Sequence, residues 1–358
     1  MTPDPTTSYR RLAARLDALP NGFPPSPDGV ELRLLAKLFT PEEADLASQL
    51  SQSLETPAQV AARTGGDPDE MRKQLKSMSR RGLILAGPVE AGLGFALLPF
   101  VVGIYEMQVN TIDAELASLF EQYYRQAFGA VLAVQPPVHR VIPVNESIRT
   151  DLEVRPFESA AEIIASCRAW GVMDCICRKQ KKLIGQACSH PVEMCMLMSS
   201  TPGAFDRAGH VRVLTQEQAM VTLRQAAEAG LVHSVSNNQK DIWYICNCCT
   251  CSCGVLRGLV DLGLANVVAR SSYRCEVDQD ICLLCGACLD RCQFRALVLD
   301  TTLWVDLQRC AGCGVCTLAC LEGALHLVPR PEEEVTSPPL DETVWKEARL
   351  KSRNLNRD

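Results

Sequence analysis

Eight cysteines near the C-terminus fall into two runs with the same spacing. The first run is Cys282, Cys285, Cys288 and Cys292, and the second is Cys310, Cys313, Cys316 and Cys320. The spacing C-x2-C-x2-C-x3-C lets three thiolates on one tight loop reach three irons of a cubane cluster, while the fourth ligand comes from elsewhere. Zinc sites instead use cysteine pairs separated by a long gap. The runs therefore predict a duplicated unit that binds two [4Fe–4S] clusters.

The segment from about residue 274 to residue 328 resembles bacterial dicluster ferredoxins. The resemblance implies that the fourth cysteine of each run serves the other cluster. One cluster would take Cys282, Cys285, Cys288 and Cys320, and the other would take Cys310, Cys313, Cys316 and Cys292. Gln293 and Leu321 stand where this family usually has proline. Because proline there only stiffens the exit turn, we expect the ligation to be unchanged.

A second set of cysteines lies between residues 165 and 255, and nine of its ten members form two groups. The first group is Cys175, Cys177, Cys188 and Cys195, and the second is Cys246, Cys248, Cys249, Cys251 and Cys253. Without metal, so many thiols in one core would repel one another or be oxidised. Cys167 stands apart in an apolar run, so we expect it to be a buried hydrophobic residue.

These two groups predict at least one additional [4Fe–4S] cluster. Its candidate ligands are Cys175 or Cys177, with Cys188, Cys195 and one member of the second group. Nine cysteines would also suffice for two clusters, and zinc or a redox-active dithiol patch are the alternatives. The C-x-C-R and C-N-C-C motifs, with the terminal dicluster segment, also resemble a group of multi-cluster ferredoxin proteins from anaerobes. That resemblance implies metal binding and names no substrate.

A basic run follows the first pair of these cysteines. It consists of Arg178, Lys179, Lys181 and Lys182. Arg178 is the candidate to contact the cofactor, where a positive charge would stabilise a reduced cluster. Docking of an acidic electron partner and a solvated helix face are the alternatives. We expect His190 and His233 to lie outside the ligand set, as hydrogen-bond donors or core residues.

The segment between the two cysteine groups must bring them together. Thr215 and Gln218 predict a capping box that starts a helix ending near Ala229. Strands are expected at residues 231–233 and 242–245, leading into the cysteine-rich turn. The helix would then hold the two groups together like a clasp.

Residues 30–90 carry three similar helix-start signals. They are Thr40-Pro41-Glu42-Glu43, Thr56-Pro57-Ala58-Gln59 and Asp67-Pro68-Asp69-Glu70, each with a cap, a proline and an acid or amide. A helix over residues 67–81 would bury Met71, Leu75 and Met78, and a strand from Leu83 would form a wing. The pattern resembles winged helix-turn-helix domains of bacterial regulators.

The resemblance implies DNA binding through the helix over residues 67–81. Arg72, Lys76 and Arg80 share one face of this helix, but its N-terminal end carries acidic residues. Base-reading residues lie at that end in such helices, where the acidic groups would meet phosphates of like charge. We therefore favour a module for packing or protein contact over one that binds nucleic acid.

We predict an α+β multidomain protein. The domains are an arm at 1–29, a winged-helix-like domain at 30–90, a mixed α/β cysteine-rich domain at 91–270, a dicluster ferredoxin domain at 271–330 and a tail at 331–358. The connector should contain strands at residues 97–105 and 138–144 around a helix at 111–128. The proline- and glutamate-rich start of the tail is too polar to build a core, and residues 343–354 form a short basic segment.

Composition points to a cytoplasmic protein. The chain has 358 residues, 19 cysteines and a formal net charge of −6, so it has no whole-molecule attraction to nucleic acid or anionic membranes. No signal peptide is visible, and the longest apolar stretch, residues 91–105, is too short to span a bilayer. In a cytoplasmic chain, many cysteines indicate metal ligands rather than disulfides.

The function expected from these features is electron transfer through iron–sulfur clusters. No nucleotide-binding loop is present, so the donor and acceptor should be redox partner proteins or a small redox molecule. One alternative is a cluster-based redox sensor that acts through a DNA-binding domain. The other is a reductase with an open iron at the additional centre.

Overall fold

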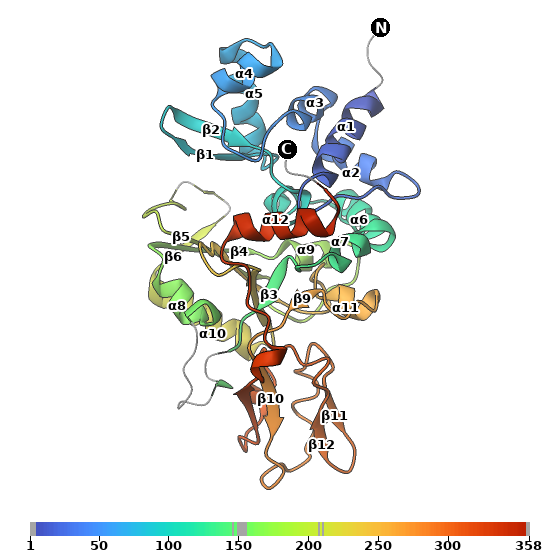
Figure 1. The fold of residues 1–358 in the computed structure, drawn as a ribbon, viewed down its shortest axis with the longest axis vertical. Coiled ribbons are helices and arrows are strands. Elements are labelled where there is room, and N and C mark those ends of the chain that lie inside the picture. The colour runs from blue at the N-terminus through green and yellow to red at the C-terminus, as the bar shows by residue number, and fades with distance from the viewer. Residues whose placement is uncertain (1–4, 145–146, 149–155, 207, 210, 356–358) are drawn as a thin grey trace. The chain divides into compact units, whose positions relative to one another are not determined.

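The computed structural model describes residues 5–144, 147–148, 156–206, 208–209 and 211–355 (Figure 1). Helices and sheets are both present, which confirms the α+β class. The chain divides into two compact units: Met1–Val131 with Leu183–Gly185 and Arg349–Asp358, and Leu132–Lys182 with Gln186–Ala348. None of the helices in the described part of the chain has the length and apolar character that a bilayer crossing requires.

The first unit begins with helices followed by a hairpin. Its elements are α1 (Pro5–Asp17), α2 (Val30–Leu38), α3 (Pro41–Ser48), α4 (Pro57–Thr64), α5 (Pro68–Arg80), β1 (Leu85–Val89) and β2 (Gly92–Ala96). Thr40 and Thr56 form the capping boxes that the sequence predicted. Asp67 caps α5 by accepting hydrogen bonds from the amides of Asp69 and Glu70. These caps confirm the predicted helix starts. They were predictable because a cap acts over only three residues.

An aromatic core completes the first unit. Phe100 contacts Phe23 with ring centroids 4.5 Å apart, and Tyr105 stacks on Phe120 at 3.8 Å. The predicted strand at residues 97–105 is wrong, because β2 ends at Ala96 and the chain then makes irregular turns that bury these side chains between helices. The helices that follow are α6 (Ala114–Tyr123) and α7 (Gly129–Ala133), and the C-terminal helix is α12 (Glu342–Ser352).

Two arginines near the C-terminus pack against residues of the first unit. Arg349 is fully buried, and its guanidinium donates hydrogen bonds to the carbonyl oxygens of Pro20 at 2.8 Å and Val131 at 2.9 Å. Arg353 forms a 2.8 Å ion pair with Asp17. The basic segment therefore contributes to packing, since its long side chains satisfy carbonyl groups left free at chain turns.

A seven-stranded sheet forms the centre of the second unit, in the order β6-β4-β5-β8-β7-β3-β9. The strands are β3 (His139–Val141), β4 (Ala169–Asp174), β5 (Glu193–Ser199), β6 (Arg212–Leu214), β7 (Val232–Ser236), β8 (Tyr244–Cys248) and β9 (Val268–Ala269). Neighbours are antiparallel except β3 and β9. The accompanying helices are α8 (Ala160–Ala165), α9 (Ile176–Leu183), α10 (Gln216–Glu228) and α11 (Arg257–Asp261).

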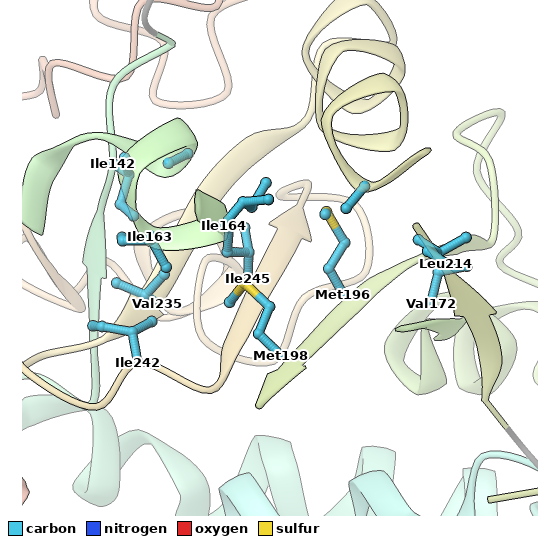
Figure 2. Packing of buried hydrophobic residues seen from close by; sticks show 12 residues of the cluster. Ile142, Ile163, Ile164, Val172, Met196, Met198, Leu214, Val235, Ile242 and Ile245 are labelled. Carbon is cyan, nitrogen blue, oxygen red and sulfur yellow. The ribbon is translucent and has the colours of Figure 1, made fainter. Parts of the chain in front are cut away.

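Helices α8 and α10 pack on one face of this sheet. Ile163 and Ile164 of α8 lie among strand residues that include Val235 and Ile245 (Figure 2). Ala219 places α10 in the same cluster, and Thr215 starts α10 with the predicted capping box. The small residues Ala219 and Ala226 allow this helix to approach the strands closely.

The last part of the second unit contains two short antiparallel strand pairs. Strand β10 (Tyr273–Val277) pairs with β13 (Leu325–Pro329), and β11 (Leu297–Leu299) pairs with β12 (Leu303–Val305). The amide of Asp278 donates to the carbonyl of Ala324 at 2.8 Å, and the amide of Asp306 donates to that of Ala296 at 2.7 Å. Equivalent residues of the two cysteine repeats thus make equivalent contacts, as expected of a duplicated unit.

Candidate metal centres

The two terminal cysteine runs lie on loops framed by these short strands. The sulfur of Cys292 accepts a hydrogen bond from the amide of Ala296 at 3.2 Å, and the sulfur of Cys320 accepts one from Ala324 at 3.2 Å. The fourth cysteine of each run is therefore held in the same way. Amide hydrogen bonds to sulfur stabilise the thiolate form that a metal requires.

Each run has a cysteine of the other run as a neighbour. Burial raises the pKa of Cys313, and negative charge at Cys316 and Cys292 raises it further. Burial also raises the pKa of Cys288 to about 11, with contributions from Cys316 and from Cys320. Cys292 is thus an electrostatic neighbour of Cys313 in the second run, and Cys320 of Cys288 in the first.

A ninth cysteine adjoins these runs. Cys275 in β10 is buried, and its sulfur lies 3.7 Å from that of Cys316. Its amide donates a hydrogen bond to the sulfur of Cys310. The sequence analysis did not single out Cys275 because it belongs to neither spacing pattern. The sequence signal that could have identified Cys275 is its position two residues before the repeated Val277–Asp278 pair.

In the middle of the chain, six cysteines form one group, here termed the six-thiol group. Its members are Cys175, Cys177, Cys195, Cys246, Cys248 and Cys253. Strand pairing explains part of it: Met196 of β5 lies opposite Ile245 of β8, so the adjoining Cys195 and Cys246 meet across the strands. Cys175 follows β4, Cys177 lies in α9, and Cys253 lies in the turn after β8.

Burial and hydrogen bonds between thiols shift the pKa values of this group in opposite directions. Neighbouring thiols Cys195 and Cys248, together with burial, raise the pKa of Cys246. The pKa of Cys248 is lowered because Cys246 and Cys253 hydrogen-bond to its sulfur. Such clustered, buried thiols can lie together as thiolates when a metal or cluster displaces their protons and balances their charge.

A separate arrangement contains Cys188, His190, Cys249 and Cys251, here termed the Cys/His site. One ligand atom from each residue lies within 4.8 Å of the others. Cys188 and His190 come from the loop between α9 and β5, and Cys249 and Cys251 from the turn after β8. With the 19 cysteines all free of disulfides, these groups suggest metal binding.

The structure divides the predicted ligands of the additional centre between these two groups. Cys188 lies with Cys249 and Cys251, whereas Cys195 lies beside Cys246. His190, which the sequence analysis placed outside the ligand set, is within reach of three thiols. The C-x-H spacing opposite a C-x-C pair was the sequence signal for this residue.

Arg178 lies between the two groups and is only 3% exposed. Its Nη1 donates to the carbonyl of Asn247 at 3.0 Å, and its guanidinium also hydrogen-bonds to Cys249. Burial by itself would lower the pKa of Arg178, but negative charge at Cys175, Cys249 and Cys248 holds it above its ordinary value. The thiolates that a metal requires would balance the charge of this buried guanidinium. The donor set therefore fits a metal or cluster.

The remaining candidates lie elsewhere. Lys179 pairs with Asp174 at 3.3 Å, and Lys182 is exposed. His233 is buried, and its Nδ1 lies 2.6 Å from the side-chain oxygen of Asn247. Cys167 is half-buried against the core of the sheet. Lys181 is buried, and its ammonium hydrogen-bonds to the side-chain oxygen of Gln186.

Comparisons of the chain with protein families, curated proteins and solved structures find no match. The chemistry is therefore inferred from the residues themselves.

Proposed function

We propose that this protein is an electron carrier with two [4Fe–4S] clusters in its C-terminal repeat and a further iron–sulfur cluster in the six-thiol group. The observation that carries the proposal is the repeated four-cysteine loop, in which the sulfurs of Cys292 and Cys320 accept equivalent amide hydrogen bonds. Iron–sulfur clusters supply one-electron transfer when bound. The proposal extends to a ferredoxin-like domain at the C-terminus, a cysteine-rich middle domain and a cytoplasmic location in an anaerobe.

The two terminal runs differ in their access to solvent. Cys310, Cys313 and Cys316 are buried, whereas Cys285 is exposed. The apolar side chain of Leu283 within the first run is 69% exposed, and that of Leu321 directly after the second run is 97% exposed. Because large exposed apolar residues often mark contact surfaces, these side chains are where a redox partner protein with an apolar surface would dock.

Gln293 connects the terminal repeat with the cysteine-rich turn. Its side-chain oxygen accepts a hydrogen bond from the amide of Thr250 at 2.9 Å, and its side-chain nitrogen donates to the carbonyl of Gly230 at 3.0 Å. Cys292 directly precedes Gln293, and Cys249 directly precedes Thr250. The contact holds the terminal loops beside the middle centres, and short separation favours electron exchange.

Arg178 would stabilise the reduced state of a centre in the middle domain. A buried guanidinium beside sulfur ligands favours the more negative, reduced state of a centre, because the added charge is partly compensated. Ser234 supplements it, since its hydroxyl lies 3.6 Å from the sulfur of Cys248.

The proposal is tested by anaerobic purification, iron and acid-labile sulfide analysis, and spin resonance of the reduced protein. We expect about twelve irons per chain, of which about eight belong to the terminal repeat. Cys195→Ser and Cys246→Ser should each lower the total by about four. Colourless protein without sulfide contradicts the whole proposal, and about eight irons in the wild type contradicts the middle cluster.

A redox-sensing regulator is a second candidate. Helix α5 and the β1–β2 hairpin occur in the order of a winged helix, and Arg72, Lys76 and Arg80 are exposed. DNA binding that weakens steeply with salt, and that changes when the clusters are oxidised, would favour it. Unchanged binding after Lys76→Glu would count against it.

A further inference from the structure

The Cys/His site is a compact set of three thiols and one imidazole. Its four ligand atoms lie within 4.8 Å of one another, and it is the one such group of three or more among the described residues. Four ligand atoms are the number that a single tetrahedral ion requires.

The spacing of these ligand atoms matches the size of a single zinc ion. Tetrahedral zinc with bonds of about 2.3 Å to sulfur and about 2.0 Å to nitrogen holds its ligand atoms roughly 3.5 to 3.8 Å apart. A cubane places four irons and four sulfides between its ligands and so keeps the thiolates further apart. Ligand atoms within 4.8 Å therefore enclose a single ion.

The protein environment also suits a single ion. The Nδ1 atom of His190 is buried and has no hydrogen-bond partner in the described structure, and Cys249 is fully buried. Three thiolates around a divalent ion leave one excess negative charge, and the guanidinium of Arg178 hydrogen-bonds to Cys249. The arrangement is closed by four protein ligands, as in structural zinc sites.

We propose that Cys188, His190, Cys249 and Cys251 bind one zinc ion, separate from any iron–sulfur cluster. The ion ties the loop before β5 to the turn after β8. That turn also carries Cys253 of the six-thiol group and Thr250, which bonds Gln293. Zinc thus positions the cysteine-rich turn without exchanging electrons, because it has no redox chemistry at these ligands. This inference does not depend on the proposed electron carrier.

The experiment is metal analysis of the full chain, purified without oxygen or added metal. We expect about one zinc per chain in the wild type. Cys251→Ser and His190→Ala should each reduce zinc at least fivefold and leave iron and visible absorption unchanged. Cys167→Ser, a half-buried cysteine outside the groups, serves as the control and should retain both metals.

Zinc-edge X-ray absorption provides an independent measurement on the same protein. The wild type should show three sulfur ligands and one nitrogen ligand, and His190→Cys should show four sulfur ligands while keeping the ion. Absence of zinc from the wild type, oxygen ligands at the zinc, or loss of about four irons in Cys251→Ser would overturn the proposal. Since His190→Cys preserves a complete ligand set, failure of the other variants to fold leaves the test intact.

Discussion

At the scale of single residues, Arg178 shows how a sequence neighbour becomes part of a site. It follows Cys177 in a basic run, yet it is buried while Lys182 is exposed. The carbonyl oxygen of Asn247 accepts one of its hydrogen bonds, and thiolate sulfur would balance its charge. Burial beside the cysteines is what separates this residue from the rest of the basic run.

We predict that Arg178→Met lowers the reduction potential of the nearest iron–sulfur centre. Loss of a buried positive charge makes the added electron less favourable, and the change should be tens of millivolts or more. A redox titration followed by spin resonance measures it. Lys182→Met removes an exposed charge from the same helix and should leave the potential nearly unchanged. Equal shifts in the two variants would refute a specific role for Arg178.

At the scale of elements, caps and strand pairing position the functional side chains. Asp67 starts α5 by bonding two of its free amides, and Thr215 starts α10 with a capping box. The pairing of β5 with β8 brings Cys195 and Cys246 together. The caps fix where the helices start, and the strand register fixes which cysteine loops face each other.

We expect Asp67→Ala to destabilise the first turn of α5 by about 1 kcal/mol, since two amides lose their acceptor. Hydrogen exchange at the amides of Asp69 and Glu70 should become faster, by several-fold. Asp69→Ala removes a neighbouring carboxylate that caps nothing in the described structure. It should leave that exchange rate nearly as it is, and matching rates in the two variants would disprove the capping role.

His139 in β3 makes the stability of the sheet depend on pH. Burial lowers its pKa from 6.5 to about 4, so the unfolded chain takes up a proton before the folded chain does. Stability is therefore full above pH 6.5 and falls as the pH drops toward about 4, by at most ~3 kcal/mol. Denaturant unfolding between pH 5 and pH 7 checks this.

His139→Leu should remove most of this pH dependence. His326→Leu, in the more exposed strand β13, is the comparison and should retain it. An unaltered slope in His139→Leu would show that other groups govern the acid response.

At the scale of the molecule, Gln293 connects the terminal repeat to the cysteine-rich turn by hydrogen bonds within the second unit. Its two hydrogen bonds, to Thr250 and Gly230, use a position where ferredoxins usually carry proline. Proline has neither the donor nor the acceptor. A glutamine at this position thus makes a contact between two cysteine-rich regions.

We predict that Gln293→Pro keeps the iron content but slows electron exchange between the terminal and middle centres several-fold. The terminal ligands are unchanged, whereas the contact that sets the separation is lost. Pulse radiolysis followed at cluster absorption bands measures the rate. Leu321→Pro makes the same change at the equivalent position of the second run, where the side chain is 97% exposed. Slowing of both variants alike would rule out a specific effect of the Gln293 contact.

The sequence by itself determined the features that depend on neighbouring residues. The caps at Thr40, Thr56 and Thr215 were predictable because each signal spans three or four positions. The candidate cysteines were identifiable because a cluster-binding loop requires short, regular spacing. The strand expected at residues 97–105 failed because an apolar stretch of that length suits a buried turn as well as a strand.

Only the tertiary structure decided how the middle cysteines are shared. It assigned Cys188 and Cys195 to different groups, added His190 to one of them and turned Arg178 inward. These contacts join loops that are distant in the chain, and they follow from the register of β5 and β8 and the path of the turn between residues 249 and 253. Spacing along the chain specifies which residues share a loop, whereas packing of the sheet specifies which loops meet.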